Sequence, residues 1–240
     1  MTHLSTLSNH AASLLGITLS DEQIDKFERL TELLLSWNER MNLTAITEPA
    51  EIAIKHYLDA LTLAQAVPQF DDLRLIDVGT GAGFPGLPLA IVFPRLQVAL
   101  MDSTAKKLRF IDDVAQSLGL ENITSLHARA EDAGQSKRHR EAYDIVVARA
   151  VARMPVLAEY TLPLCKVGGQ AVAMKGTSAF EETAAAAKAI TALGGELFGI
   201  EEVMLPTLDN PRYLIVMDKI KPTPRRYPRK AGLPSRQPIV

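Results

Sequence analysis

The sequence predicts an α/β fold, a doubly wound seven-stranded sheet that follows an N-terminal helical extension. From residue 73 onward, short apolar strand-like runs alternate with helical patterns, which is typical of a parallel sheet covered on both faces. The last two strands are joined only by the turn-rich segment PTLDNP at 206–211. Two successive strands with no helix between them predict an antiparallel pair, so we expect the last strand to run against the others.

The composition indicates a soluble globular protein. The chain has 240 residues, of which 47% are hydrophobic and 22% charged, and a single cysteine. One cysteine excludes an intramolecular disulfide framework and a Cys-rich zinc site. No apolar stretch approaches the ~20 residues of a membrane span, and no basic start leads into an apolar run, so we expect no secretory signal and a cytoplasmic location. Nothing in the sequence indicates an obligate protein partner.

Helical patterns fill the first 68 residues. Ser20 is a good N-cap and Gln23 completes a capping box, and apolar residues at helical spacing then predict a helix to about Met41. A second helix is expected from Pro49, an allowed first-turn residue, to Pro68. The domain boundaries that we predict are a helical extension over 1–68, a sheet-bearing domain over 69–219 and a C-terminal arm over 220–240.

Strands and helices then alternate along the sheet-bearing domain. The expected strands lie at 73–78, 96–101, 122–127, 143–148, 168–175, 195–205 and 212–219. The expected helices lie at 87–93, 103–119, 130–140, 154–165 and 178–194. Cys165 falls at the end of one of these helices, where we expect a small buried residue and not a nucleophile.

A glycine-rich loop lies directly between the first strand and the next helix, and it has two interpretations. Gly81, Gly83 and Gly86 match G-x-G-x-x-G, the dinucleotide fingerprint. Asp77 with Gly79, Gly81 and Gly83 instead gives the D-x-G-x-G-x-G pattern of enzymes that use S-adenosylmethionine (SAM). A carboxylate at the strand tip would repel a pyrophosphate and favour the cationic SAM, so Asp77 favours SAM. The alternative role for Asp77 is an acid that caps the turn.

Asp102, at the end of the second strand, indicates a ribose-bearing cofactor. An acid at this position accepts hydrogen bonds from both ribose hydroxyls, in SAM and NAD sites alike. The inserted antiparallel last strand favours the class I SAM-dependent methyltransferase type, by fold-level analogy. An NAD(P)-linked oxidoreductase and a non-catalytic RNA-binding factor with a vestigial cofactor site are the alternatives.

The charge of the chain is concentrated at its C-terminus. The net charge is −2, from 26 basic and 28 acidic residues, and positions 219–240 hold seven of the basic residues, five prolines and no acid. We expect this arm to be extended. It is either a solvated tail or a strap that binds nucleic-acid phosphates. The RNA-binding candidates are Arg225, Arg226, Tyr227, whose ring could stack on a base, Arg229 and Lys230, with Lys175 after the fifth strand.

With these features in place, the sequence resembles the bacterial 16S ribosomal RNA guanine-N7 methyltransferases, the glucose-inhibited division protein B family. The matching blocks span almost the whole chain: WNERMNLTAIT at 37–47, HYLDAL at 56–61, LIDVGTGAGFPGLPLAI at 75–91, MDSTAKKLRFI at 101–111, HARAED at 127–132, ARAVA at 148–152 and YPRKAGLPSRQP at 227–238. The resemblance implies SAM as cofactor and 16S ribosomal RNA, or the small ribosomal subunit particle, as partner. The cofactor contacts that it implies are Gly79, Phe84, Ala130, Glu131 and Arg149, with Asp102 at the acidic position.

The reaction implied by the resemblance does not need a side chain that acts as a general base. N7 of guanine already carries an available lone pair, so no proton has to be removed before methyl transfer. Positioning alone can supply ~7–11 kcal/mol in favourable cases. We therefore assign no catalytic side chain and no metal. For Arg149, buried after a run of apolar residues, a ligand contact is favoured over a structural ion pair, and His56 and Asp59 are expected to form a local polar pair.

Overall fold

The computed structural model describes residues 3–67 and 69–240. The N-terminal helices are α1 (His3–Leu15), α2 (Asp21–Met41), α3 (Pro49–Ile52), η1 (Ala53–Leu58), α4 (Asp59–Leu61) and α5 (Leu63–Ala66). The predicted capping box at Ser20 is confirmed, with reciprocal hydrogen bonds to Gln23 of 3.2 and 3.0 Å. The predicted helix from Pro49 is also confirmed at its start, but η1 within it has π-helical hydrogen bonding. Its expected end at Pro68 lies outside the described residues.

The sheet-bearing region contains the seven strands that the sequence predicts. They are β1 (Arg74–Val78), β2 (Gln97–Asp102), β3 (Ile123–His127), β4 (Tyr143–Arg149), β5 (Cys165–Lys175), β6 (Gly195–Val203) and β7 (Arg212–Lys219). The remaining helices are α6 (Gly86–Val92), α7 (Ala105–Leu118), α8 (Ala130–Gln135), α9 (Met154–Thr161), α10 (Ala179–Ala192) and α11 (Leu233–Arg236). No helix of the described chain is both long enough and apolar enough to cross a membrane.

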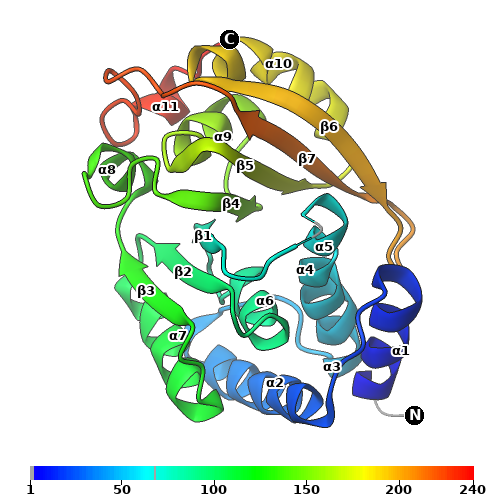
Figure 1. Ribbon diagram of the computed structural model, residues 1–240. Helices are drawn as coiled ribbons and strands as arrows, with labels where there is room; N and C mark the ends of the chain where they lie inside the picture. The colour runs from blue at the N-terminus through cyan, green and yellow to red at the C-terminus, as the bar shows by residue number, and fades with distance from the viewer. Residues whose placement is uncertain (1–2, 68) are drawn as a thin grey trace.

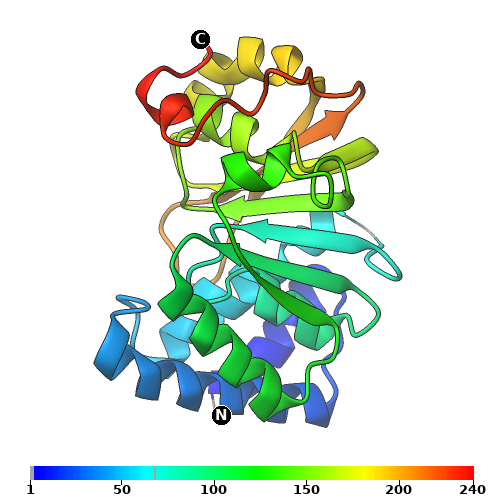
Figure 2. The same ribbon diagram turned by 90° about the vertical axis from the view of Figure 1, so that its left-hand side faces the viewer.

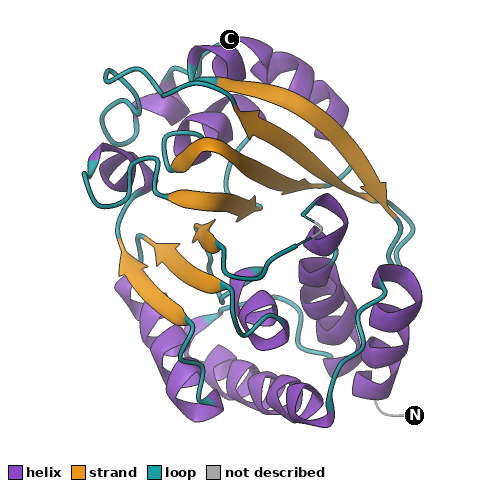
Figure 3. Cartoon of the chain, in the orientation of Figure 1, coloured by secondary structure: helices purple, strands orange, loops and turns teal. Residues whose placement is uncertain are grey.

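All seven strands form one sheet in the order β3-β2-β1-β4-β5-β7-β6 (Figure 3). Neighbouring strands among β1 to β5 pair in parallel. The last strand, β7, is inserted between β5 and β6 and is antiparallel to both. The predicted antiparallel last strand is therefore confirmed.

Helices cover both faces of the sheet, as expected for a doubly wound fold (Figure 1). Successive side chains of a strand point to opposite faces, so β1 contributes Leu75 to one core and Ile76 to the other. The first core also contains α2, α6 and α7, and the second contains α9 and α10. Figure 2 shows the two helical layers on opposite sides of the strands.

The helical extension is joined to the sheet-bearing region by packing and by hydrogen bonds. Its buried residues belong to the same core as α6 and α7. The side-chain Nε2 of Gln23 donates to the carbonyls of Ile91 and Val92, at the C-terminal end of α6. The last carbonyls of a helix have no hydrogen-bond donor within that helix. The Gln23 side chain of α2 therefore supplies the donor for these two carbonyls of α6.

Two predictions about local structure are wrong. Helix α9 ends at Thr161, and β5 begins at Cys165, which pairs with Tyr143 of β4. Strand pairing therefore overrides the helical pattern at this point. Cys165 is buried, as expected. The C-terminal arm is not a free extended segment, because it folds against α8 and α9 and forms the short helix α11.

Candidate active site

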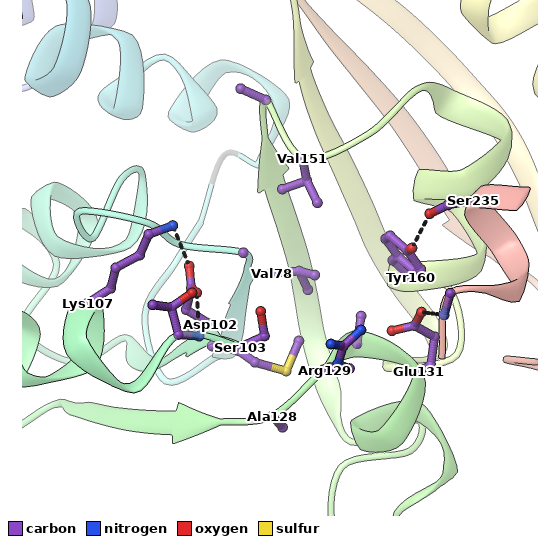
Figure 4. Close-up of a pocket in the computed structure, with 16 residues that line it drawn as sticks. Val78, Asp102, Ser103, Lys107, Ala128, Arg129, Glu131, Val151, Tyr160 and Ser235 are labelled. Carbon is purple, nitrogen blue, oxygen red and sulfur yellow. Dashed lines mark hydrogen bonds and ion pairs between the residues drawn. The ribbon is translucent and has the colours of Figure 1, made fainter. Parts of the chain in front are cut away.

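A cavity of about 390 Å³ lies beyond the carboxyl ends of β1, β2 and β4. This is the edge of an open α/β sheet at which ligands bind. Figure 4 shows Asp102 and Lys107 on one side of the cavity and Glu131, Tyr160 and Ser235 on the other. The lining residues are Val78, Gly79, Met101, Asp102, Ser103, Thr104, Lys107, Ala128, Arg129, Ala130, Glu131, Ala150, Val151, Tyr160, Gly232 and Ser235.

Of the glycines in the loop, Gly79 lines the cavity. The amides of Gly79 and Thr80 both donate to the carbonyl of Met101, at 2.8 and 3.0 Å, which ties the loop to β2. Gly79 has φ +71°, a left-handed conformation, and a Cβ there would lie 2.8 Å from Cγ2 of Val151. Glycine is therefore required at this position both by the backbone and by the space available.

Gly81 and Gly83 shape the loop without lining the cavity. The amide of Gly81 donates to Oδ2 of Asp102 at 3.1 Å. At Gly83, with φ +83°, an added Cβ would overlap the Leu87 side chain. Gly81 thus holds the loop against β2, and Gly83 allows the loop to pack on α6.

Asp77, which the sequence predicts to face the ligand, does not line the cavity. Its side chain is fully buried and lies outside the cavity lining. Oδ2 accepts hydrogen bonds from the hydroxyl of Thr80 at 2.7 Å and from the amide of Gly86 at 3.0 Å. Asp77 therefore caps the turn, which was the alternative interpretation. Burial raises the pKa of Asp77 to about 6, although the hydrogen bonds from Thr80 and Gly86 act to lower it. Its Oδ1 has no hydrogen-bond partner.

Asp102 lies where the sequence places it, at the cavity wall. Its Oδ1 accepts from the amide of Thr104 at 2.8 Å, and its Oδ2 contacts Nζ of Lys107 at 3.3 Å. These contacts fix the carboxylate at the tip of β2. Because the Lys107 side chain is 38% exposed, it can move aside for hydroxyl groups that enter the cavity.

Ala130 and Glu131 also line the cavity, at the start of α8, and here the C-terminal arm contributes a wall. Oε1 of Glu131 accepts from the amide of Gly232 at 2.8 Å. The hydroxyls of Tyr160 and Ser235 are 2.8 Å apart. Gly232, Ser235 and Tyr160 were not predicted from the sequence, since no local pattern indicates that residues this far apart in the chain lie together.

Phe84 and Arg149 lie outside this cavity, beside a second one. Arg149 donates to Oδ2 of Asp59 at 2.8 Å and to the carbonyl of Lys55 at 3.0 Å. Its guanidinium also contacts Nδ1 of His56 and lies over the Phe84 ring. Arg149 therefore does form a structural ion pair, and His56 and Asp59 meet through it and not as a local pair. Burial, with the nearby Arg149 charge, lowers the pKa of His56 to about 4.

The second cavity has a volume of about 450 Å³ and lies at the carboxyl ends of β4 and β5. Asp59 and Arg149 are among its lining residues, together with Lys175 and Arg212. Ala150, directly after β4, lines both cavities. The two cavities are therefore neighbours that share one lining residue.

The candidate RNA-binding residues divide into exposed and paired groups. Arg225, Arg226 and Lys230 are exposed, and Arg226 lies over the half-buried ring of Tyr227. Lys175 instead pairs with Glu182 at 2.8 Å, and Arg229 pairs with Glu159 at 2.6 Å. The exposed cations are free to meet a phosphate, whereas the paired ones position the protein's own elements.

The segment QSKRHREA at 135–142, which contains three basic residues besides His139, contacts the arm through Gln135 and Arg140. Nη1 of Arg140 donates to the carbonyl of Tyr227 at 2.7 Å, and Nη2 donates to the carbonyl of Thr223 at 2.6 Å. The side-chain Nε2 of Gln135 donates to the carbonyl of Pro228 at 2.8 Å. Gln135 and Arg140 therefore bind the backbone of the arm.

The sheet order, the inserted antiparallel β7 and a cavity beside the glycine loop define the class: the fold is that of the class I SAM-dependent methyltransferases. It is similar to a 16S rRNA adenine-N1 methyltransferase from Catenulisporales acidiphilia, solved with SAM, with a TM-score of 0.52 and 19% identity over 68% of this chain and 91% of that one. A precorrin-6y methyltransferase from Geobacter metallireducens gives a TM-score of 0.51 and 19% identity, over 68% and 87% of the two chains.

The particular family is shown by sequence. The family model for GidB, rRNA small subunit methyltransferase G, matches residues 23–208. Proteins named ribosomal RNA small subunit methyltransferase G are 48% identical in Alkaliphilus metalliredigens, over 94% of each chain, and 49% identical in Acetivibrio thermocellus, over 99% of this chain and 97% of that one. The chain belongs to this family.

Proposed function

We propose that this protein transfers the methyl group of SAM to N7 of a specific guanosine in 16S ribosomal RNA. The observation that carries the proposal is that Ala150 lines two cavities, one beside the glycine loop and one at the ends of β4 and β5. Membership of the rRNA small subunit methyltransferase G family supports RNA as the methyl acceptor. Because the substrate is ribosomal, we expect the protein to act in the cytoplasm.

The residues of the first cavity fit SAM. Gly79 leaves room that a Cβ would fill. Asp102 presents a carboxylate at the tip of β2, suited to ribose hydroxyls. We assign Gly79, Asp102, Ala130 and Glu131 to cofactor binding from the cavity wall, and Gly81 and Gly83 to the shape of the loop. Asp77 supports that loop from beneath.

We do not assign Phe84 and Arg149 to the wall of the first cavity. Arg149 lines the second cavity together with Ala150, and its guanidinium lies over the Phe84 ring. When bound, SAM supplies an electrophilic methyl group. The chain's own contribution is to hold donor and acceptor on either side of Ala150 and to exclude water between them. Since N7 attacks with its own lone pair, the proposal needs no general base.

Methyl transfer to RNA tests the proposal directly. Purified protein is incubated with labelled SAM and either small-subunit RNA or small ribosomal subunit particles that lack the modification, and the labelled nucleotide is mapped. We expect label on N7 of a single guanosine. Label on another atom, or no transfer to either substrate, would contradict the proposal. Calorimetric titration with SAM and with NAD separates it from an oxidoreductase function.

A further inference from the structure

Among the described residues that line the second cavity, one buried side-chain oxygen, Oδ1 of Asp59, has no hydrogen-bond partner. Asp59 comes from the helical extension, and its side chain is only 4% exposed. Oδ2 accepts from Arg149 at 2.8 Å. Oδ1 is buried without a hydrogen-bond partner, and an ion-pair contact of 3.5 Å to Nε of Arg212 is all that the described chain offers it. A buried, unsatisfied carboxylate oxygen costs free energy unless a ligand completes it.

The other carboxylate of this cavity is fully used. Oε1 of Glu182 accepts from the hydroxyl of Ser178 at 2.8 Å. Oε2 accepts from the amide of Met154 at 2.9 Å and from Nζ of Lys175 at 2.8 Å. Two acids therefore line the same space, and Asp59 is the one with an acceptor left for a donor group that enters it.

The chemistry of the purines determines which donor fits. Adenine and guanine both have N7, so an enzyme that methylates N7 of guanine has to recognise a different part of the base. Guanine presents two adjacent donors, N1–H and the N2 amino group, where adenine presents an acceptor at N1. A carboxylate matches the guanine edge and repels the adenine one. Protein side chains read this Watson–Crick edge in unpaired RNA bases.

We propose that Asp59 recognises the target guanine, with Oδ1 accepting hydrogen bonds from N1–H and the N2 amino group. This inference rests on the proposed function and names the residue that gives it base specificity. N7 lies on the Hoogsteen edge of the purine and not on the Watson–Crick edge, which carries N1 and N2. A base whose Watson–Crick edge meets Asp59 therefore directs N7 away from it, and the first cavity lies across Ala150. The Arg212 side chain, 36% exposed, rotates away from Oδ1 when the base enters.

The first test changes the target base of the RNA and leaves the protein unchanged. After the modified guanosine has been mapped, small-subunit RNA is ligated with guanosine, inosine or adenosine at that position. Inosine keeps N7, O6 and N1–H but lacks the N2 amino group. Loss of one hydrogen bond to a charged acceptor predicts a fall in kcat/KM of about 10- to 100-fold for inosine. Adenosine is expected to give no transfer.

The second test assigns that discrimination to Asp59. The Asp59→Asn variant is expected to lose activity on guanosine and to reduce the guanosine-to-inosine ratio of kcat/KM to within about 3-fold of unity. Glu182→Gln is the matched control, a second acid of the same cavity, and should keep the wild-type ratio. Because Asp59→Asn leaves Arg149 without its ion pair, folding is checked by circular dichroism, and the Asp59→Asn/Arg149→Gln double variant removes both charges if the single variant is unfolded.

The outcomes separate this inference from the function on which it rests. Equal rates on guanosine and inosine with the wild-type protein would overturn the role of Asp59 and leave methylation of guanosine standing. A wild-type ratio retained in a folded Asp59 variant would also overturn it. Absence of transfer to guanosine-containing RNA and particles would instead overturn the proposed function, and this inference with it.

Discussion

Arg229 of the C-terminal arm is held by Glu159 of α9, whose side chain is completely buried. The guanidinium donates to both carboxylate oxygens, with Nη2 2.6 Å from Oε2 and Nε 3.0 Å from Oε1. The backbone amide of Arg229 donates to Oε1 as well, at 2.7 Å. Such bidentate, charge-assisted pairs are the strong ones. A segment whose composition resembles a solvated tail is therefore fastened to the sheet-bearing region.

We expect Arg229→Ala to destabilise the protein by about 3 kcal/mol, because it leaves the buried carboxylate of Glu159 without a cation. Urea unfolding measures the change in free energy. Arg226→Ala is the matched control, since Arg226 is exposed, and it should cost less than about 1 kcal/mol. Equal effects of the two substitutions would show that the ion pair does not fasten the arm.

The exposed cations of the arm are predicted to bind RNA phosphates. Substituting Arg225, Arg226 and Lys230 together with Gln should reduce the slope of log affinity against log salt by about 2 to 3, because each phosphate contact contributes about 0.7–0.9. Binding titrations of small-subunit RNA at several salt concentrations measure this slope. Deleting residues 222–240 is a less specific test, because it also removes Gly232 and Ser235 from the cavity wall. An unchanged slope would show that these cations do not bind RNA phosphates and that the role of the arm is structural.

Gly79→Ala is expected to weaken SAM binding by at least about 10-fold, since its Cβ would lie 2.8 Å from Val151. Gly16→Ala is the matched control. Gly16 has a similar φ of +67°, but nothing lies within 4 Å of its added Cβ. Both variants should lose about 1 kcal/mol of stability from backbone strain, and SAM affinity should fall in the first alone. Calorimetric titration measures the affinity, and the additional substitution Val151→Ala should restore part of it.

Asp77→Asn is expected to change how stability depends on pH. The folded pKa of Asp77, about 6, is above its ordinary value of 3.8. Its contribution to stability is therefore fully present below pH 3.8 and is lost as pH rises through 6. The stability of Asp77→Asn relative to wild type should rise between pH 4 and pH 7, by up to about 3 kcal/mol.

Chemical denaturation at several pH values measures this difference between the two proteins. Asp25→Asn, on the exposed surface of α2, controls for the loss of one carboxylate elsewhere. A difference that stays constant or shrinks with rising pH would contradict the burial of an uncompensated carboxylate at the glycine loop.

Local patterns were sufficient for most of the fold. Alternation of apolar runs with helices predicted the sheet, and two successive strands predicted the antiparallel last strand. The same patterns failed at Cys165, where pairing with β4 overrode a helical pattern. They also failed for the arm, whose proline-rich composition gives no sign of the distant carboxylate that binds it.

The candidate site was only partly accessible from sequence. Gly79, Asp102, Ala130 and Glu131 line the first cavity, as expected for residues that follow strands at the carboxyl edge of the sheet. Asp77, which also belongs to the loop motif, lies beneath the turn, because its orientation depends on the hydrogen bonds from Thr80 and Gly86. A motif fixes the identity of a residue, whereas the hydrogen bonds around it fix the direction of its side chain.

By itself, the sequence determined the order of strands and helices, the position of the glycine loop and the family, because these depend on residues close together along the chain. Only the tertiary structure determined which charged side chains form ion pairs within the protein. Asp59, Arg149 and Arg212 meet only after the helical extension has packed against the sheet, as Glu159 and Arg229 meet only after the arm has folded back. Contacts between distant segments produce no periodic pattern in the sequence. The unpartnered Oδ1 of Asp59 in the second cavity is therefore evident only from the tertiary structure.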